Sequence, residues 1–130
     1  MTERSLPADD PAAAASAPGV VLLLTTFPDR ERAEAAARDW VAAGLAACVH
    51  VAPAGASIYA WQGTLEASAE VAVTAKTVAT RVEALHEALR SAHPYQLPEV
   101  LLLEPAGGST EYLDWVRSAC RPGTVPLAAS

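Results

Sequence analysis

The spacing of apolar residues along the chain predicts alternating strands and helices. Residues 20–26 form one continuous apolar run rich in β-branched side chains, which is typical of a buried strand. Asp29 then favours the start of a helix as an N-cap residue. Apolar residues recur at helical spacing up to Gly44, which is expected to end that helix.

The next stretch, residues 45–76, predicts one long hairpin. Apolar and more polar side chains alternate over residues 71–76, a period of two that marks a strand with one buried face. The chain is expected to reverse near Gly63, because glycine permits a positive φ. Residues 53–55 contain a proline and a glycine, which predict a break or bulge in the first strand. An arm of this length cannot bury both faces against the rest of the chain, so we expect another copy of the chain to cover it.

Two helices and a strand complete the predicted order. One helix begins with the capping-box sequence of residues 80–83 and ends before Pro94. A buried strand follows over residues 98–104, and Ser109 or Thr110 caps a last short helix. This order predicts an α+β, ferredoxin-like βαββαβ fold with a long central hairpin and an extra C-terminal helix.

Length and composition fit one domain flanked by two tails. The 130 residues match the size of a single domain. Residues 1–18 are rich in Ala, Pro and Asp without an apolar period, and we expect a disordered tail there. Residues 121–130 predict a second flexible tail, so the expected domain spans residues 19–120.

Net charge and the sequence signals for targeting limit which binding partners and which cellular compartment we expect. The net charge is −6 and the sequence holds no basic run, so we expect neither nucleic acid nor a membrane as a partner. The longest apolar run is much shorter than the roughly 20 residues of a membrane span. Two cysteines without a secretory signal predict free thiols in a reducing cytoplasm.

The densest group of chemically versatile residues is the loop that contains His93, Tyr95 and Glu99. Pro94 and Pro98 restrict its backbone. Imidazole is a common metal ligand, and a carboxylate can orient it. The alternative is a loop in which the His and Tyr side chains satisfy local backbone groups. One His and one Glu do not complete a zinc site of three or four ligands, so a metal site here would have to be shared among subunits.

Four side chains of the predicted hairpin are further candidates. Cys48 and His50 stand two residues apart on one strand face and could bind a metal, although a free Cys in an apolar strand is more often a small buried side chain. Glu70 and Lys76 fall on the more polar face of the next strand. They form either a partly buried pair facing a cleft or a solvated edge. The second cysteine, Cys120, is expected to be more exposed than Cys48.

Tyr59 and Trp61 place two aromatic side chains on one face just before the hairpin turn. Large aromatic side chains near the tip of an exposed arm suggest interface anchors. The sequence contains no P-loop, nucleophile elbow or zinc-protease motif. We therefore expect that the protein is not an enzyme.

Taken together, these residues resemble the CutA family of divalent-cation tolerance proteins, from about Gly19 to Arg117. The markers are Thr25-Thr26-x-Pro28, Leu45-Ala46-Ala47-Cys48-Val49, Ser57-Ile58-Tyr59-x-Trp61-x-Gly63, Glu70, Lys76-Thr77, His93-Pro94-Tyr95, Pro98-Glu99 and Tyr112-x-x-Trp115. The resemblance implies a ferredoxin-like fold and a compact homotrimer in which hairpin strands pair across subunits.

The resemblance also implies Cu²⁺ or another divalent cation as the ligand, without an organic cofactor. Copper ligands assigned in the family are a Cys that ends the first strand and a His pair just before Pro-Tyr. Here Thr25 stands at the Cys position and Ala92-His93 at the His pair. The resemblance therefore leaves His93 as the metal ligand, with Tyr95 and Glu99 as its nearest supporting residues.

These observations predict a trimeric cytoplasmic protein that binds divalent metal ions and responds to them. A second interpretation is a trimeric small-molecule sensor with its ligand in clefts between subunits. A third is a small hydrolase of the acylphosphatase type, which needs an Arg in a phosphate-binding loop after the first strand. Arg30 is close, but Pro28-Asp29 stand where glycines and backbone donors are needed.

Overall fold

The computed structural model of the chain describes residues 16–122. Its elements are β1 (Val20–Phe27), α1 (Arg30–Ala42), β2 (Cys48–Trp61), β3 (Thr64–Val78), α2 (Ala79–Ala92), β4 (Leu101–Leu103) and α3 (Thr110–Ala119). The four strands form one antiparallel sheet in the order β2-β3-β1-β4. This is the predicted ferredoxin-like arrangement with its additional C-terminal helix.

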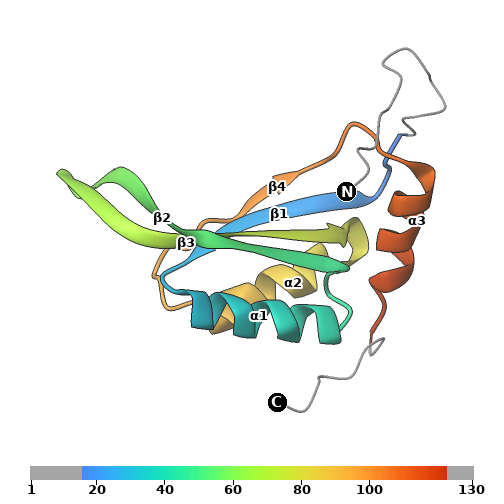
Figure 1. Ribbon diagram of the computed structural model, residues 1–130, viewed down its shortest axis with the longest axis horizontal. Helices are drawn as coiled ribbons and strands as arrows, with labels where there is room; N and C mark the ends of the chain where they lie inside the picture. The colour runs from blue at the N-terminus through green and yellow to red at the C-terminus, as the bar shows by residue number, and fades with distance from the viewer. Residues whose placement is uncertain (1–15, 123–130) are drawn as a thin grey trace.

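The core lies between the sheet and helices α1 and α2, which cover the same face (Figure 1). Leu23 of β1 and Val73 of β3 pack there against Trp40 of α1 and Leu85 of α2, and all four are buried. Full burial of one large apolar side chain contributes about 1.5–3 kcal/mol. The alternation over residues 71–76 predicted one buried face of the hairpin, and the burial of that face in β3 confirms the prediction.

The helix α1 begins and ends where the sequence predicts. The Asp29 carboxylate accepts a hydrogen bond from the backbone N–H of Arg32 at 2.8 Å, which satisfies one free donor of the first turn. At the other end, Gly44 adopts φ 71°, a conformation that suits glycine.

The hairpin of β2 and β3 forms an arm that extends beyond the helices (Figure 1). The chain reverses at Gln62 and Gly63, with φ values of 51° and 81°. The pairing register shifts between Val51 and Ala54, next to the predicted proline break. The long arm, its turn and its irregular first strand are thus confirmed.

Two details of the predicted elements are wrong. α2 begins at Ala79, not at a capping box, and its N-cap Val78 makes no side-chain hydrogen bond. The backbone N–H of Ala79 instead donates to the carbonyl of Gly19 at 2.7 Å, because β3 runs directly into the helix. The predicted buried strand over residues 98–104 is reduced to Leu101–Leu103 at the sheet edge, where it is exposed on the single chain.

The predicted burial of the two cysteines is reversed. Cys48 is half-buried, whereas Cys120 is buried with 6% of its surface exposed. The reason is α3, whose end packs Cys120 against Val20 and Ala47. Helix packing at the end of the sheet was not visible in the local pattern around Cys120.

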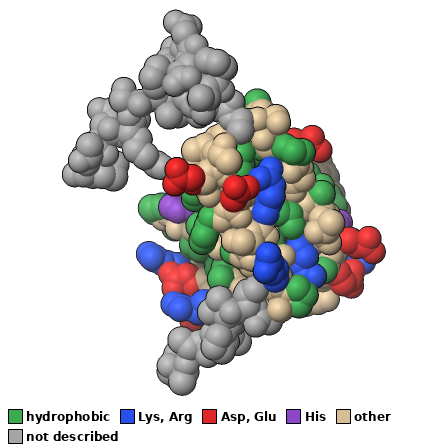
Figure 2. All heavy atoms as spheres, turned by 90° about the vertical axis from the view of Figure 1, so that its right-hand side faces the viewer, with side chains coloured by type: hydrophobic (Ala, Val, Ile, Leu, Met, Phe, Trp, Pro, Cys, Tyr) green, Lys and Arg blue, Asp and Glu red, His purple; other side chains and the backbone are tan. Residues whose placement is uncertain are grey.

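The predicted tails fall outside the described residues, apart from residues 16–18 and 121–122. Ala17 belongs to the folded part, since it is buried in the cluster around α3. No helix among residues 16–122 is long and apolar enough to cross a membrane. On the side of the molecule that carries α3, acidic and basic side chains are interspersed with apolar ones (Figure 2).

Candidate functional site

A groove of about 710 Å³ lies between the arm and the loop of residues 94–101. It is lined by Thr26, Tyr59, Trp61, Glu70, Pro94, Tyr95, Gln96, Leu97, Pro98, Glu99, Val100 and Leu101. Segments distant in sequence meet here: the end of β1, both strands of the arm, and the loop after α2. Five of the candidate residues, Tyr59, Trp61, Glu70, Tyr95 and Glu99, therefore share one surface.

His93 holds the groove-forming loop in place. It is buried, and its Nε2 contacts the carbonyl oxygen of Thr26 at 2.5 Å. Its Nδ1 lies 3.1 Å from the backbone N of Tyr95, which donates to it. Because Nδ1 accepts a hydrogen bond from the Tyr95 amide, the proton of a neutral ring is on Nε2 and points to the Thr26 carbonyl. Phe27 stacks on the imidazole with 4.6 Å between ring centroids.

The hydrogen bonds of His93 restrict its ability to bind a metal ion. Both ring nitrogens of His93 are hydrogen-bonded, so a metal ion can bind the ring only by displacing the Thr26 carbonyl or the Tyr95 amide. Within residues 16–122, no three side chains of His, Cys, Asp or Glu lie close enough to hold a metal ion together. On the single chain, the His93 ring hydrogen-bonds to one nearby backbone group, the Tyr95 amide, and to one distant in sequence, the Thr26 carbonyl, and its role as a metal ligand stays a prediction.

Glu70 and Tyr95 lie together in the groove. The hydroxyl of Thr26 donates to the Glu70 carboxylate at 3.2 Å. Burial raises the pKa of Tyr95 to about 12, and its hydrogen bond with Glu70 adds to the rise, while the charge of Arg32 lowers it. At neutral pH the phenol therefore stays protonated and donates a hydrogen bond to the Glu70 carboxylate.

The charge of the groove is negative and uncompensated. Glu70 and Glu99 both line it, and the described lining residues include no Lys, Arg or His. Neither carboxylate takes part in a salt bridge within the described part of the chain. The partners of Glu70 are neutral hydroxyls, which stabilise its charge without cancelling it.

Tyr59 and Trp61 form the aromatic wall of the groove on the arm. Their exposed fractions are 41% and 43%. The Tyr59 hydroxyl shares a hydrogen bond of 2.9 Å with Ser68 across the hairpin, which fixes the ring relative to β3. Their role as interface anchors stays a prediction.

The remaining candidates lie elsewhere on the sheet. Cys48 and His50 pair in register with Lys76 and Thr74 of β3, so they share a face but stand apart from the groove. Of the two alternatives for Glu70 and Lys76, the ion pair does not form within residues 16–122. The Lys76 ammonium instead donates to the Tyr112 hydroxyl at 3.0 Å and lies 5.2 Å from the centre of that ring. This hydrogen bond raises the pKa of Lys76.

The sequence contains three further residues near these sites whose contacts were not predicted. Thr26 was treated as a strand residue, although the alternation of β1 already placed it on the face opposite the helices. At the level of the sequence, Tyr112 is only a marker of the resemblance, and the structure shows it exposed and in contact with Lys76. Thr25, the residue at the family's Cys position, is buried with a side-chain hydroxyl that has no partner within the described residues.

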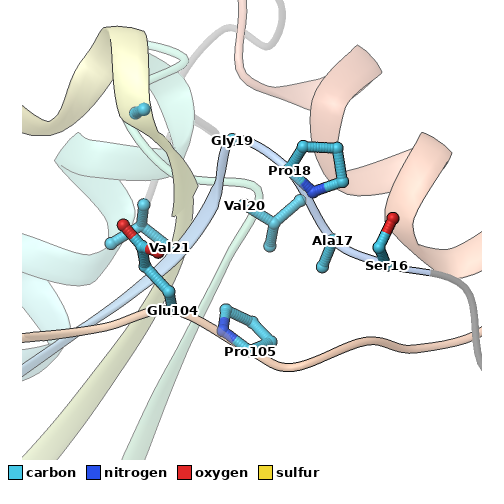
Figure 3. Close-up of a pocket in the computed structure, with 9 residues that line it drawn as sticks. Ser16, Ala17, Pro18, Gly19, Val20, Val21, Glu104 and Pro105 are labelled. Carbon is cyan, nitrogen blue, oxygen red and sulfur yellow. The ribbon is translucent and has the colours of Figure 1, made fainter.

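A second hollow, of about 290 Å³, lies where β4 leaves the sheet. Figure 3 shows that Glu104 and Pro105 face the segment from Ser16 to Val21 there. Its described lining is mostly small apolar side chains, with Glu104 as the one charged residue. Such a lining offers little for specific recognition, so the groove is the better candidate.

Comparisons with known proteins agree with this architecture. The sequence matches the family described as CutA1 divalent ion tolerance protein over residues 21–119. A relative from Citrobacter koseri, named divalent-cation tolerance protein CutA, is 41% identical over 113 residues. The match covers 87% of this chain and 98% of that protein.

Solved structures show the same similarity. The structure of CutA from Synechococcus elongatus PCC7942 has a TM-score of 0.79 at 39% identity and covers 83% of this chain and 96% of that one. A structure of the Synechococcus protein complexed with a Bis-Tris molecule gives a TM-score of 0.75 at 38% identity, over 82% and 98% of the two chains.

Proposed function

Because the chain belongs to the CutA1 family of divalent ion tolerance proteins, we propose that it is a homotrimer that binds divalent cations in the groove between the arm and the 94–101 loop. The observation that carries the proposal is the pair of carboxylates, Glu70 and Glu99, on one surface without a cationic partner among the described residues. Uncompensated carboxylates attract cations and supply the oxygen ligands that divalent ions accept.

In this proposal His93 positions the site and does not ligate the metal. Its Nε2 bond ties the ring to Thr26, and its Nδ1 accepts from the amide of Tyr95, whose hydroxyl hydrogen-bonds to Glu70. If Cu²⁺ is the physiological ion, an imidazole ligand would suit it better than carboxylates alone. Direct ligation by His93 then requires the loop to release one ring nitrogen.

Exposed apolar side chains support the assembly. Leu101, Leu102 and Leu103 form an edge strand on which each side chain is about half exposed. Ile58 and Leu65 near the tip of the arm are 71% and 77% exposed. An open, apolar edge strand can pair with a strand of another chain. In a trimer, the second and third copies would cover the β4 edge and the apolar side chains near the tip of the arm.

We also propose that the protein acts by binding, not by catalysis, and that it works in the cytoplasm. Arg30, the residue on which a hydrolase interpretation depended, forms a surface ion pair with Glu34 on α1. Two free cysteines fit a reducing compartment.

Calorimetric titration of the metal-free protein with Zn²⁺ and Cu²⁺ tests the site. Glu70→Gln and Glu99→Gln should each lower the affinity about tenfold or more, because each removes one charged oxygen ligand. Glu83→Gln on α2, which removes the same charge outside the groove, is the matched control and should bind like the wild type. If His93→Ala abolishes binding while both groove variants bind normally, the imidazole is the ligand and the proposed site is wrong.

The size of the groove favours a second candidate function, that of a small-molecule sensor. A volume of about 710 Å³ is in the range of sites for small organic ligands, and Tyr59, Trp61 and Leu97 supply apolar walls. The Synechococcus relative has been obtained in complex with Bis-Tris, a small organic molecule. A panel of metabolites in the same calorimeter, with Trp61→Leu as the groove variant, separates this function from metal binding.

A further inference from the structure

We infer that the groove recognises an organic cation, a small ammonium compound that carries apolar substituents. This inference rests on the second candidate function, because it takes the groove as a site for an organic molecule. It concerns the chemical class of that molecule, which follows from the side chains that line the groove.

The aromatic lining is the first argument. Tyr59 and Trp61 come from β2 and Tyr95 from the opposite loop, so aromatic side chains stand on both sides of the groove. The faces of aromatic rings attract ammonium groups, and trimethylated or alkylated ammonium groups also gain from apolar contact. Leu97 and Pro98 extend the apolar surface.

The charge of the lining is the second argument. Glu70 and Glu99 contribute negative charge, and no positive side chain is among the described lining residues. The cation that acts on the pKa of Tyr95 is Arg32, and its guanidinium is paired with Asp29 at 2.7 Å. A bound ammonium group would supply the missing counter-charge, whereas an anionic ligand would meet repulsion from both carboxylates.

The pre-formed shape is the third argument. Tyr95 is held by its backbone bond to His93, Tyr59 by its bond to Ser68, and Glu70 by Thr26. Walls fixed in this way lose little conformational freedom when a ligand enters. A bare metal ion would use few of these walls, since the described residues offer no compact set of three ligands there.

The test compares choline with its uncharged isostere 3,3-dimethylbutan-1-ol by calorimetry on the full chain in phosphate buffer, which contains no organic amine. Choline should bind at least about tenfold more tightly, because only its charge distinguishes the two probes. Glu70→Gln should remove most of that preference, and Glu83→Gln should retain it. Light scattering checks that each variant keeps the assembly of the wild type.

Equal binding of the two probes, or no binding of choline at millimolar concentration, overturns the inference. If choline fails but Zn²⁺ binds in a manner that depends on Glu70, the inference is wrong and the proposed metal function stands. If choline binds and neither Zn²⁺ nor Cu²⁺ does, the metal part of the proposed function fails and the inference stands.

Discussion

Two buried threonines on adjacent strands show how a single hydroxyl can raise or lower stability. Thr77 donates to the carbonyl of Leu45 at 2.6 Å, whereas the hydroxyl of Thr25 has no partner within the described residues. Burying an unpaired hydroxyl costs roughly 1–3 kcal/mol, and valine has nearly the same shape without that cost. Thr25→Val should therefore stabilise the protein by about 1 kcal/mol.

The matched variant is Thr77→Val, which should destabilise the protein by about 1–2 kcal/mol because it leaves the Leu45 carbonyl without its donor. Urea denaturation at one fixed protein concentration measures both free energies of unfolding. A loss of stability in Thr25→Val would indicate that its hydroxyl has a partner in the assembled protein.

The thiol of Cys120 should react slowly in the native protein. Burial raises its pKa, so little of the reactive thiolate forms at pH 8, and the surrounding side chains block access. In a Cys48→Ser variant, which leaves Cys120 as the only cysteine, a thiol reagent should label the folded protein at least about tenfold more slowly than the protein in urea. Similar rates in both conditions would argue against the packing of α3 on Val20 and Ala47.

Tyr95 should ionise later than an ordinary tyrosine. Its pKa of about 12 means that the phenolate signal in an alkaline absorbance titration should contain one transition near pH 12 that is missing in Tyr95→Phe. Because the folded pKa lies above the unfolded one, the stability that this group contributes is present below about pH 10 and is lost as the pH rises towards 12. If the transition missing in Tyr95→Phe lies near pH 10, the ordinary value for tyrosine, Tyr95 is not buried in the groove wall.

At the scale of the elements, the turn at the tip of the arm contains a residue that does not favour its backbone conformation. Gln62 adopts φ 51°, a left-handed conformation that Asn tolerates better than Gln. Gln62→Asn should stabilise the hairpin by a few tenths of a kcal/mol up to about 1 kcal/mol, and β-branched Gln62→Val should destabilise it. Thermal unfolding of the two variants gives the test, and the reverse order of melting temperatures would show that the arm tip is remodelled in the assembly.

The elements were predictable because their signals are local. The alternation in β3, Asp29 at the start of α1 and glycine at the turn each act within a few residues. For the site, the sequence predicted individual residues but not the contacts between them. The partner of the His93 ring is the carbonyl of Thr26, 67 positions earlier, and no local pattern connects the two. The same holds for Cys120, whose burial depends on contacts with Val20 of β1 and with Ala47, the residue before β2.

For the whole molecule, the exposed β4 edge and arm predict assembly. Multi-angle light scattering of the full chain at micromolar concentration should give three times the chain mass. Replacing Leu102 with Lys on the β4 edge should shift the equilibrium towards the monomer, because a charge opposes edge pairing. Glu83→Lys on α2 is the control and should leave the trimer intact. A monomeric wild type would end the assembly part of the account.

The central claim is that the groove between the arm and the 94–101 loop is where this protein binds its cation. The most direct test is an anomalous difference map from crystals of the full-length protein soaked with Zn²⁺. The account predicts a peak in the groove against the carboxylates of Glu70 and Glu99, with both hydrogen bonds of His93 intact. A peak on the His93 ring with the Tyr95 amide displaced, or a peak between Cys48 and His50, would contradict it.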